Sequence, residues 1–214
     1  MKRLWSLRVC ALALGLTLSL LAGCSNRPHG LTLLALPTDP PDAQVVAPAT
    51  TARGNTPAAA NIVLRRVQIP EYLQSNHVRF RNSAETLSEW PDTRWAERLE
   101  VSLTRHLLQQ LGSLLPAGVL CDTHCPDTAR AASLQVNYQA LDYLRHRGLL
   151  QAQVSWSLTP ASGTTLPARQ GHFSLSEPVT TDSAAGQAAA MARLNARLVQ
   201  QVAQGLAPGS AGTP

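Results

Sequence analysis

The sequence lacks the short motifs by which several classes of enzyme are recognised. It has no Gly-x-x-x-x-Gly-Lys loop to hold phosphates, so it offers no ATP site of that kind. It also has no Gly-x-Ser-x-Gly nucleophile motif and no His-Glu-x-x-His zinc pair. Catalysis would need a nucleophile assembled from scattered Ser, His and Asp residues. We therefore predict that the protein is not an enzyme, and we expect neither a cofactor nor a metal.

Basic residues are also few and scattered. The chain carries 18 basic and 13 acidic residues, a formal net charge of +5. Three of the basic residues, Lys2, Arg3 and Arg8, lie in the first 23 positions, and without them 15 face 13, a net charge of +2. Nucleic-acid binding needs a clustered excess of positive charge, and no such run is present. We predict no nucleic-acid partner.

The apolar run at residues 9–21 is too short to span a bilayer comfortably. Because it follows the basic N-terminus, it predicts a signal peptide over residues 1–23. The run ends in Leu21-Ala22-Gly23-Cys24, the pattern of a lipobox, in which the thiol of Cys24 takes a diacylglyceryl group before cleavage. We predict that acyl chains on Cys24 anchor the mature protein to a membrane without spanning it.

The residue after Cys24 bears on which membrane that is. In enteric-type bacteria an Asp at this position commonly retains a lipoprotein at the inner membrane, and here the residue is Ser25. We therefore predict the periplasmic face of the outer membrane.

Two further cysteines remain in the mature chain, Cys121 and Cys125. The periplasm is oxidising, so a local disulfide between them is a candidate. The intervening Asp122 and His124 invite a metal interpretation, but the spacing differs from a zinc knuckle and no second ligand pair follows. We favour the disulfide.

The mature chain divides by composition into a tether, a domain and a tail. Residues 24–61 are rich in Pro, Ala and Thr, as in a flexible tether, interrupted by the apolar patch at residues 31–36. That patch is either a first strand at the sheet edge or a sticky stretch near the membrane, and we favour the strand. We predict one folded domain over residues 62–206 and a disordered tail over 207–214.

Alternation of apolar and polar residues predicts strands within this domain, at residues 62–69, 77–81, 134–140, 150–158 and 171–176. Apolar residues recur every four positions from Trp95 to Leu111, which predicts a helix capped by Thr93 and ended near Gly112 and Pro116. A second helix is capped by Asp182 or Ser183, and its predicted buried stripe is Met191, Leu194, Leu198, Val202 and Leu206. The fold class is α/β with mixed α+β character: a single domain with a mixed sheet of five to six strands covered by two main helices.

Three segments, in order behind a lipobox, resemble a known family. They are Val67-Gln-Ile-Pro-Glu-Tyr-Leu73, Val78-Arg-Phe-Arg81 and Arg94-Trp95-Ala-Glu-Arg-Leu99. In them the chain resembles the ABC-type transport auxiliary lipoproteins, which include the paraquat-inducible protein C group. The chain departs from the family's pattern at Leu31-Thr-Leu-Leu, where a tyrosine-containing strand is usual, and at Arg98, where proline is frequent.

The resemblance implies a non-catalytic, outer-membrane-anchored partner of a system that combines an ABC ATPase and permease with an MCE-domain protein and moves lipids between membranes. A homo-oligomer, such as a ring around the partner, is left open. The alternative is a lipid-binding carrier or outer-membrane assembly lipoprotein with an enclosed apolar cavity.

Five residues are candidates for the partner surface. Tyr72 and Leu73 follow Pro70 and either protrude toward a partner or pack locally. Arg79 and Arg81 share a strand face with His77 and either bind phosphate or an acidic partner, or line a solvated face, which we favour. Trp90 either contacts a partner or lipid, or packs in the core.

Overall fold

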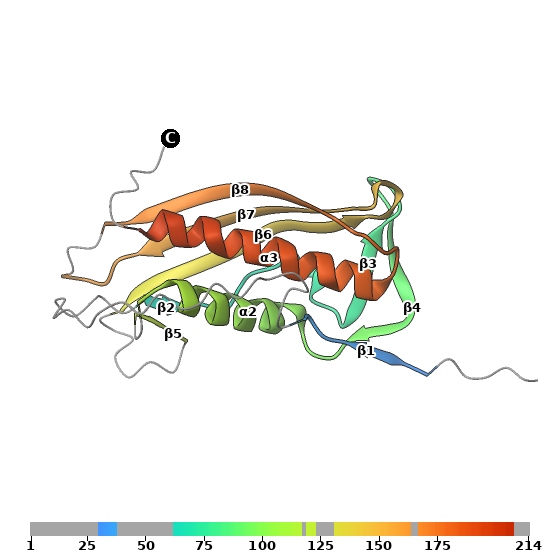
Figure 1. Cartoon of the computed structure of the whole chain (residues 1–214), viewed down its shortest axis with the longest axis horizontal. Coiled ribbons are helices and arrows are strands. Elements are labelled where there is room, and N and C mark those ends of the chain that lie inside the picture. Colours follow the sequence, from blue (N-terminus) through green and yellow to red (C-terminus); the bar gives the residue numbers. More distant parts are fainter. Residues whose placement is uncertain (1–29, 38–61, 117–118, 123–130, 164–166, 208–214) are drawn as a thin grey trace, which may run out of the picture. The chain divides into compact units, whose positions relative to one another are not determined.

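The computed structural model describes residues 30–37, 62–116, 119–122, 131–163 and 167–207, and the structural statements below concern these residues. They form one mixed sheet of eight strands with two α-helices (Figure 1). The elements in chain order are β1 (Thr32–Leu34), β2 (Ile62–Leu64), the 3-10 turn η1 (Glu71–Leu73), β3 (His77–Arg81), β4 (Leu87–Trp95), α2 (Leu99–Leu114), β5 (Leu120–Cys121), β6 (Ala132–Leu144), the 3-10 turn η3 (Arg145–Arg147), β7 (Leu149–Thr159), β8 (Arg169–Pro178) and α3 (Ala184–Leu206).

The longest strand, β6, organises the sheet. It pairs antiparallel with β7 over nearly its whole length, and β7 pairs in the same way with β8. Along β6 and β7 buried residues alternate with more accessible ones, as expected of strands with one covered face. This alternation is why all three strands were predicted at the right places, although each extends beyond its predicted bounds.

The other edge of β6 is shared by two pieces of chain that run parallel to it. β2 pairs with its beginning and β3 meets its end. Between them Gln68 forms a bridge with Asn137, and the chain then leaves the sheet at Pro70, which has no N–H to donate. The strand predicted over residues 62–69 is therefore a true strand only in its first three residues.

Strand β4 was not predicted, and the start of the following helix was predicted wrongly. β4 ends at Trp95, and α2 begins only at Leu99, so Thr93 is a strand residue rather than a cap. Pro91 and Asp92 break the alternation inside β4, and Asp92 has a φ of 49°, which disfavours an ordinary strand pattern. Trp95 and Leu99 lie four residues apart and both face the same core, so Trp95 fits the helical spacing although it is the last residue of a strand.

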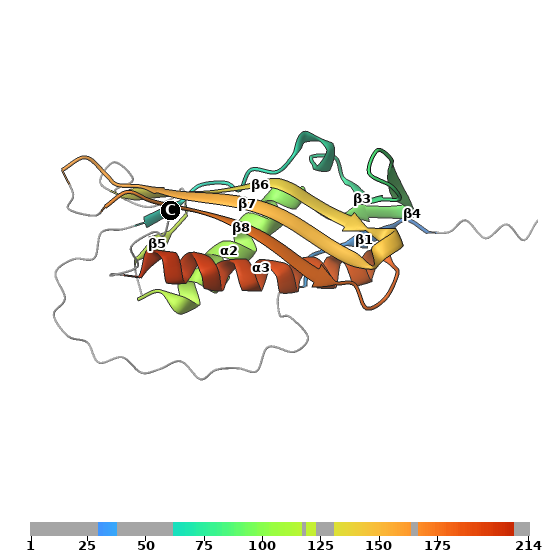
Figure 2. The same cartoon turned by 90° about the horizontal axis from the view of Figure 1, so that it is seen from above.

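Both helices bury one apolar stripe in that core. In α2 the leucines at four-residue spacing are at most 1% exposed. In α3 the predicted stripe is buried except at its last residue, Leu206, which is partly buried. Ser183 caps α3 by accepting a hydrogen bond of 3.0 Å from the backbone N–H of Gly186, whereas Asp182, the other candidate, pairs with Arg145. Figure 2 shows α3 running along one side of β6, β7 and β8.

The predicted fold class, a mixed sheet with two helices, is confirmed, but the sheet has eight strands rather than five to six. The two unpredicted strands are β4 and the two-residue β5. Of the alternatives for residues 31–36, the edge strand is realised as β1, so folded structure begins inside the segment predicted as tether. Residues 1–23, 38–61 and 208–214 lie outside the described residues, and the signal peptide, the remaining tether and the tail remain predictions.

Candidate functional site

The predicted partner surface lies at the end of the sheet where β3, β4 and η1 meet. Glu89 of β4 contacts the imidazole of His77 and accepts a hydrogen bond of 3.0 Å from Nε of Arg79. Arg79 also donates from Nη1 to the carbonyl oxygen of Tyr72, at 2.6 Å. These bonds fasten the two strands to each other and to η1. Arg79 is therefore engaged within the chain rather than held free for an anion.

Tyr72 and Arg81 converge on one carboxylate, Asp142 of β6. The Tyr72 hydroxyl donates to Oδ1 at 2.9 Å, and Nε of Arg81 lies 2.9 Å from the same oxygen. Burial, together with the Asp142 carboxylate, raises the pKa of Tyr72, so the phenol stays protonated and remains the donor. Leu73 is 4% exposed and belongs to the core. Of the two alternatives for Leu73 the structure realises local packing, and its side chain is not presented to a partner.

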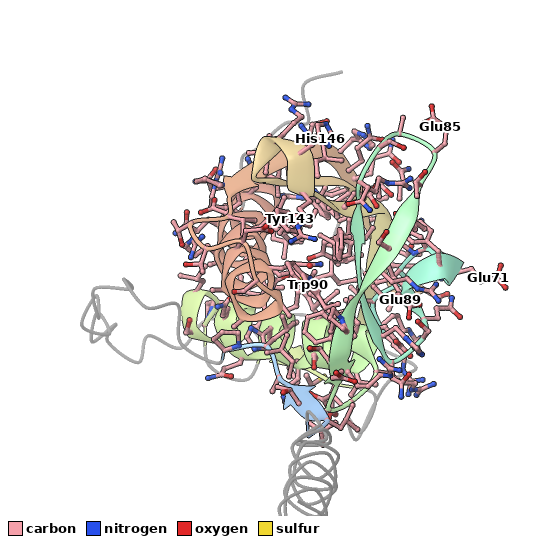
Figure 3. The ribbon with its side chains drawn as sticks, turned by 90° about the vertical axis from the view of Figure 1, so that its right-hand side faces the viewer. Glu71, Glu85, Glu89, Trp90, Tyr143 and His146 are labelled. Atoms are coloured by element: carbon pink, nitrogen blue, oxygen red, sulfur yellow. The ribbon has the colours of Figure 1, made fainter. Side chains whose placement is uncertain are left out.

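Trp90 is half-buried between the β3–β4 hairpin and α3, as Figure 3 shows. Its ring centroid lies 4.8 Å from that of Phe80, and the guanidinium of Arg145 stacks over it at 4.6 Å. Its indole N–H donates to Oε1 of Gln187 at 2.8 Å, which ties β4 to α3. Because its one polar atom is hydrogen-bonded and its ring is stacked against neighbours, Trp90 holds β4 and α3 together.

This end of the molecule thus brings together four of the five predicted residues, Tyr72, Arg79, Arg81 and Trp90, in contacts within the chain. Within the described ranges no group of three or more His, Cys, Asp or Glu side chains could hold a metal ion. No helix among them is long and apolar enough to cross a membrane. The arrangement is that of a braced sheet end, with the predicted partner role untested.

A different surface, on the side of the sheet away from α3, is not covered by any of the described helices. Alternate side chains of β6, β7 and β8 point away from α3, and we call this set the outer face. Shallow depressions of about 570 Å³ and 250 Å³ lie on it. Most of its polar members carry amide, hydroxyl or imidazole groups: Gln135, Asn137, Gln151, Gln153, Ser155, Ser157, Gln170, His172, Ser174 and Ser176. Asp142, the register partner of Gln151, also lies on this face, and its carboxylate is paired with Arg81.

The free edge of β8 adjoins the outer face and is protected over only part of its length. Arg197 of α3 donates to the carbonyl oxygen of Ser176 at 2.8 Å, and Arg193 donates to that of Pro178 at 2.8 Å. Backbone groups alternate in direction along an antiparallel strand, so those of the even-numbered residues before Ser176 also point outward. Among the described residues no backbone bond from another element reaches them. Such an unpaired edge is a site where an extended chain can add.

The alternating pattern of the sequence separates the polar side chains of the outer face from the apolar side chains of the core. It could not show which end of β8 the arginines of α3 would reach, because that depends on how α3 packs on the sheet.

Of the three cysteines of the mature chain, the described residues include Cys121. Cys121 ends β5, and its sulfur lies 3.6 Å from the carbonyl oxygen of Ile62. Cys24 and Cys125 lie outside the described residues. Lipidation of Cys24 and the pairing of Cys121 with Cys125 therefore stay predictions.

Solved structures share this fold, and two of them illustrate the likeness. A crystal structure described as that of an uncharacterized protein superposes with a TM-score of 0.60 at 20% identity, covering 69% of this chain and 92% of that one. Protein XCC0632 from Xanthomonas campestris superposes with a TM-score of 0.51 at 13% identity, covering 69% of this chain and 85% of that one. At these identities the likeness concerns the fold alone. No curated protein sequence matches the chain.

The family model that matches is described as ABC-type transport auxiliary lipoprotein component, and it covers residues 43–203. This span takes in the sheet from β2 onward and nearly all of α3. The resemblance seen in the sequence is thereby confirmed, and the chain belongs to the family of ABC-type transport auxiliary lipoprotein components.

Proposed function

We propose that this chain is a non-catalytic subunit of an ABC-type system that moves lipids between membranes, anchored by Cys24 to the periplasmic face of the outer membrane. Membership in a family of transport auxiliary lipoproteins supports the role. The lipobox supports the anchor, and Ser25 supports the choice of membrane. With no phosphate-binding loop in the sequence, the energy for transport comes from the ATPase of the system.

The partner is an MCE-domain protein, and the outer face with the free edge of β8 is the better docking candidate. Most polar groups of this surface are uncharged, and the Asp142 carboxylate at its end is already paired with Arg81, so a partner can cover it at a small cost in desolvating charge. The β8 edge adds backbone donors and acceptors that an extended segment of the partner can pair with. At the β3–β4 end, Arg79 and Arg81 are already paired with carboxylates within the chain, which makes that end the weaker candidate.

The alternative, a lipid carrier, needs an enclosed apolar cavity large enough for acyl chains. Two depressions of about 580 and 570 Å³ in the described part of the chain are open rather than enclosed, and polar and apolar groups are mixed in their lining. This geometry favours a docking subunit over a carrier.

The first test is photocrosslinking in the native host, with recovery of the full-length lipoprotein from solubilised membranes. A photoreactive residue replaces Ser155, at the centre of the outer face, or Gln109, which is exposed on α2 in the other layer. We expect an adduct with an MCE-domain protein from position 155 and none from position 109. A Cys24→Ala precursor, which cannot be acylated, should lose the adduct because the domain is no longer held at the membrane.

Each other outcome has a definite meaning. An MCE adduct from position 109 alone would retain the partner but reject the outer face. Co-purified lipid with no protein adduct from either position would favour the carrier. Acylation itself is read separately, from the intact mass of the purified protein.

A further inference from the structure

Strand β1 lies at the border of the sheet (Figure 1). One leucine in this strand and another directly before it are exposed. Leu31 is 60% exposed and Leu33 is 62% exposed. Among the described residues the only other large apolar side chain so exposed is Leu114, at the end of α2. Scattered single leucines on a surface are ordinary. Leu31, directly before β1, and Leu33, within it, lie two positions apart on one side of the chain and form a small apolar ridge close in sequence to the predicted anchor.

A cation stands next to this ridge. Leu33 is the register partner of Arg94 on β4, so their side chains project from the same face of neighbouring strands. Arg94 donates to the carbonyl oxygen of Thr93 at 3.0 Å and forms no ion pair within the described ranges. An apolar ridge flanked by a guanidinium matches the boundary between acyl chains and phosphates in a bilayer.

The length of chain between the anchor and the ridge restricts what the ridge can reach. Leu31 follows Cys24 by seven residues. Seven residues span at most about 25 Å when fully extended, so an acylated Cys24 keeps the ridge within that distance of the membrane surface. The ridge is therefore held at a high local concentration of lipid whatever path the linking residues take.

We propose that Leu31 and Leu33 insert into the interface of the bilayer that holds the Cys24 acyl chains, while Arg94 faces the phosphate groups of its glycerophospholipids. The inference rests on the proposed lipid anchor. Contact at β1 adds a second attachment beside the acyl chains and orients the sheet on the membrane. The β8 edge lies at the opposite end of the strand order from β1, so this attachment leaves that edge accessible to a partner.

The test uses the full chain, expressed in a host that processes lipoproteins and reconstituted in vesicles of phosphatidylethanolamine and phosphatidylglycerol. Leu33→Trp and Leu31→Trp place a reporter on the ridge, and Leu114→Trp is the matched control. Emission is compared in vesicles with and without brominated acyl chains, after subtraction of the signal of the wild-type tryptophans. We expect quenching of about twofold at positions 31 and 33, as for a tryptophan in the membrane interface, and none at position 114.

Two reporters are used so that one misfolded variant, detected by circular dichroism, does not decide the result. If both ridge tryptophans emit as the control does, in protein whose mass shows acylation, the ridge does not enter the bilayer and the proposal is wrong. A ridge that crosslinks to a protein in cells while staying unquenched in vesicles would equally reject the lipid contact. If the mass shows no acylation, the proposed anchor fails instead, and the two failures are thereby distinguished.

Discussion

Two glycines pack directly against the indole of Trp156, which is 4% exposed between the sheet and α3. A Cβ built at Gly205, in the last turn of α3, would lie 2.9 Å from Cη2 of Trp156 and closer still to Cζ2. Gly171 of β8 is the register partner of Trp156 and meets the pyrrole side of the ring. The ring is therefore bordered closely by the last turn of α3 and by β8.

Gly205→Ala should therefore destabilise the fold. Alanine in place of glycine favours a helix by up to about 1 kcal/mol, but overpacking a filled core costs about 1–3 kcal/mol. The last turn of α3 cannot simply swing away, because Arg169 donates to the carbonyl oxygens of Gly205 at 2.8 Å and Ala207 at 2.6 Å. We expect a net loss of about 1–2 kcal/mol in the free energy of unfolding by urea denaturation.

The chain supplies its own control. Gly112 also lies in the last turn of a helix, but a Cβ there meets nothing within 4 Å. Gly112→Ala should leave stability unchanged or raise it by about 0.5–1 kcal/mol. Trp156→Phe opens space beside Gly205, so Gly205→Ala should cost less in that background, a coupling visible in a double-mutant cycle. Equal effects of the two glycine substitutions, or no coupling, would refute the packing explanation.

Three further predictions concern polar groups. Ser183→Ala removes the cap of α3 and should lower stability by about 1 kcal/mol in urea titrations, whereas Ser183→Asp should retain most of it. Tyr138→Phe removes the hydroxyl that donates a hydrogen bond of 2.7 Å to Asn195, which is 0% exposed, and should lower the free energy of unfolding by about 1–3 kcal/mol. Combining it with Asn195→Leu should recover part of that loss. If stability is not recovered, the amide oxygen left without a donor is not the cause. Burial lowers the pKa of His106, so the folded state binds its proton less readily than the unfolded state does. Stability should therefore fall as the pH drops below the ordinary histidine pKa of about 6.5, by at most about 1.4 kcal/mol per pH unit. His106→Leu should lessen this slope in stability curves between pH 7 and 5, and an unchanged slope would show that other groups cause it.

Much of the fold was predictable from local pattern. The two-residue period of β6 and β7, the leucine spacing of α2 and the serine that caps α3 are each set by side chains that face one layer. β4 was not predicted, because Pro91 and Asp92 interrupt its alternation of apolar and polar residues. Its pairing with β1 and β3 nevertheless stabilises it as a strand. The same tertiary contacts explain why Trp95 continues the leucine spacing without being helical.

The candidate site was less predictable, for a related reason. Tyr72, Arg79 and Arg81 are residue types that bind partners on many surfaces, and in the sequence their own partners are distant or ambiguous. Asp142 follows Tyr72 by 70 positions, and Gln187 follows Trp90 by 97. Only the folded chain shows that these side chains brace the sheet end. The exposure of Leu31 and Leu33 likewise became known only when β1 was found with a single neighbouring strand.

The sequence by itself determined those properties that depend on residues close together along the chain. The lipobox, the charge balance, the missing phosphate loop and the periods of the main helices and strands are of this kind, and so is the family resemblance. The tertiary structure decided which face of β6–β8 stays uncovered, where α3 protects the β8 edge, and which polar side chains are already paired. Those properties depend on contacts between residues far apart in the chain, and a local sequence pattern does not predict such contacts.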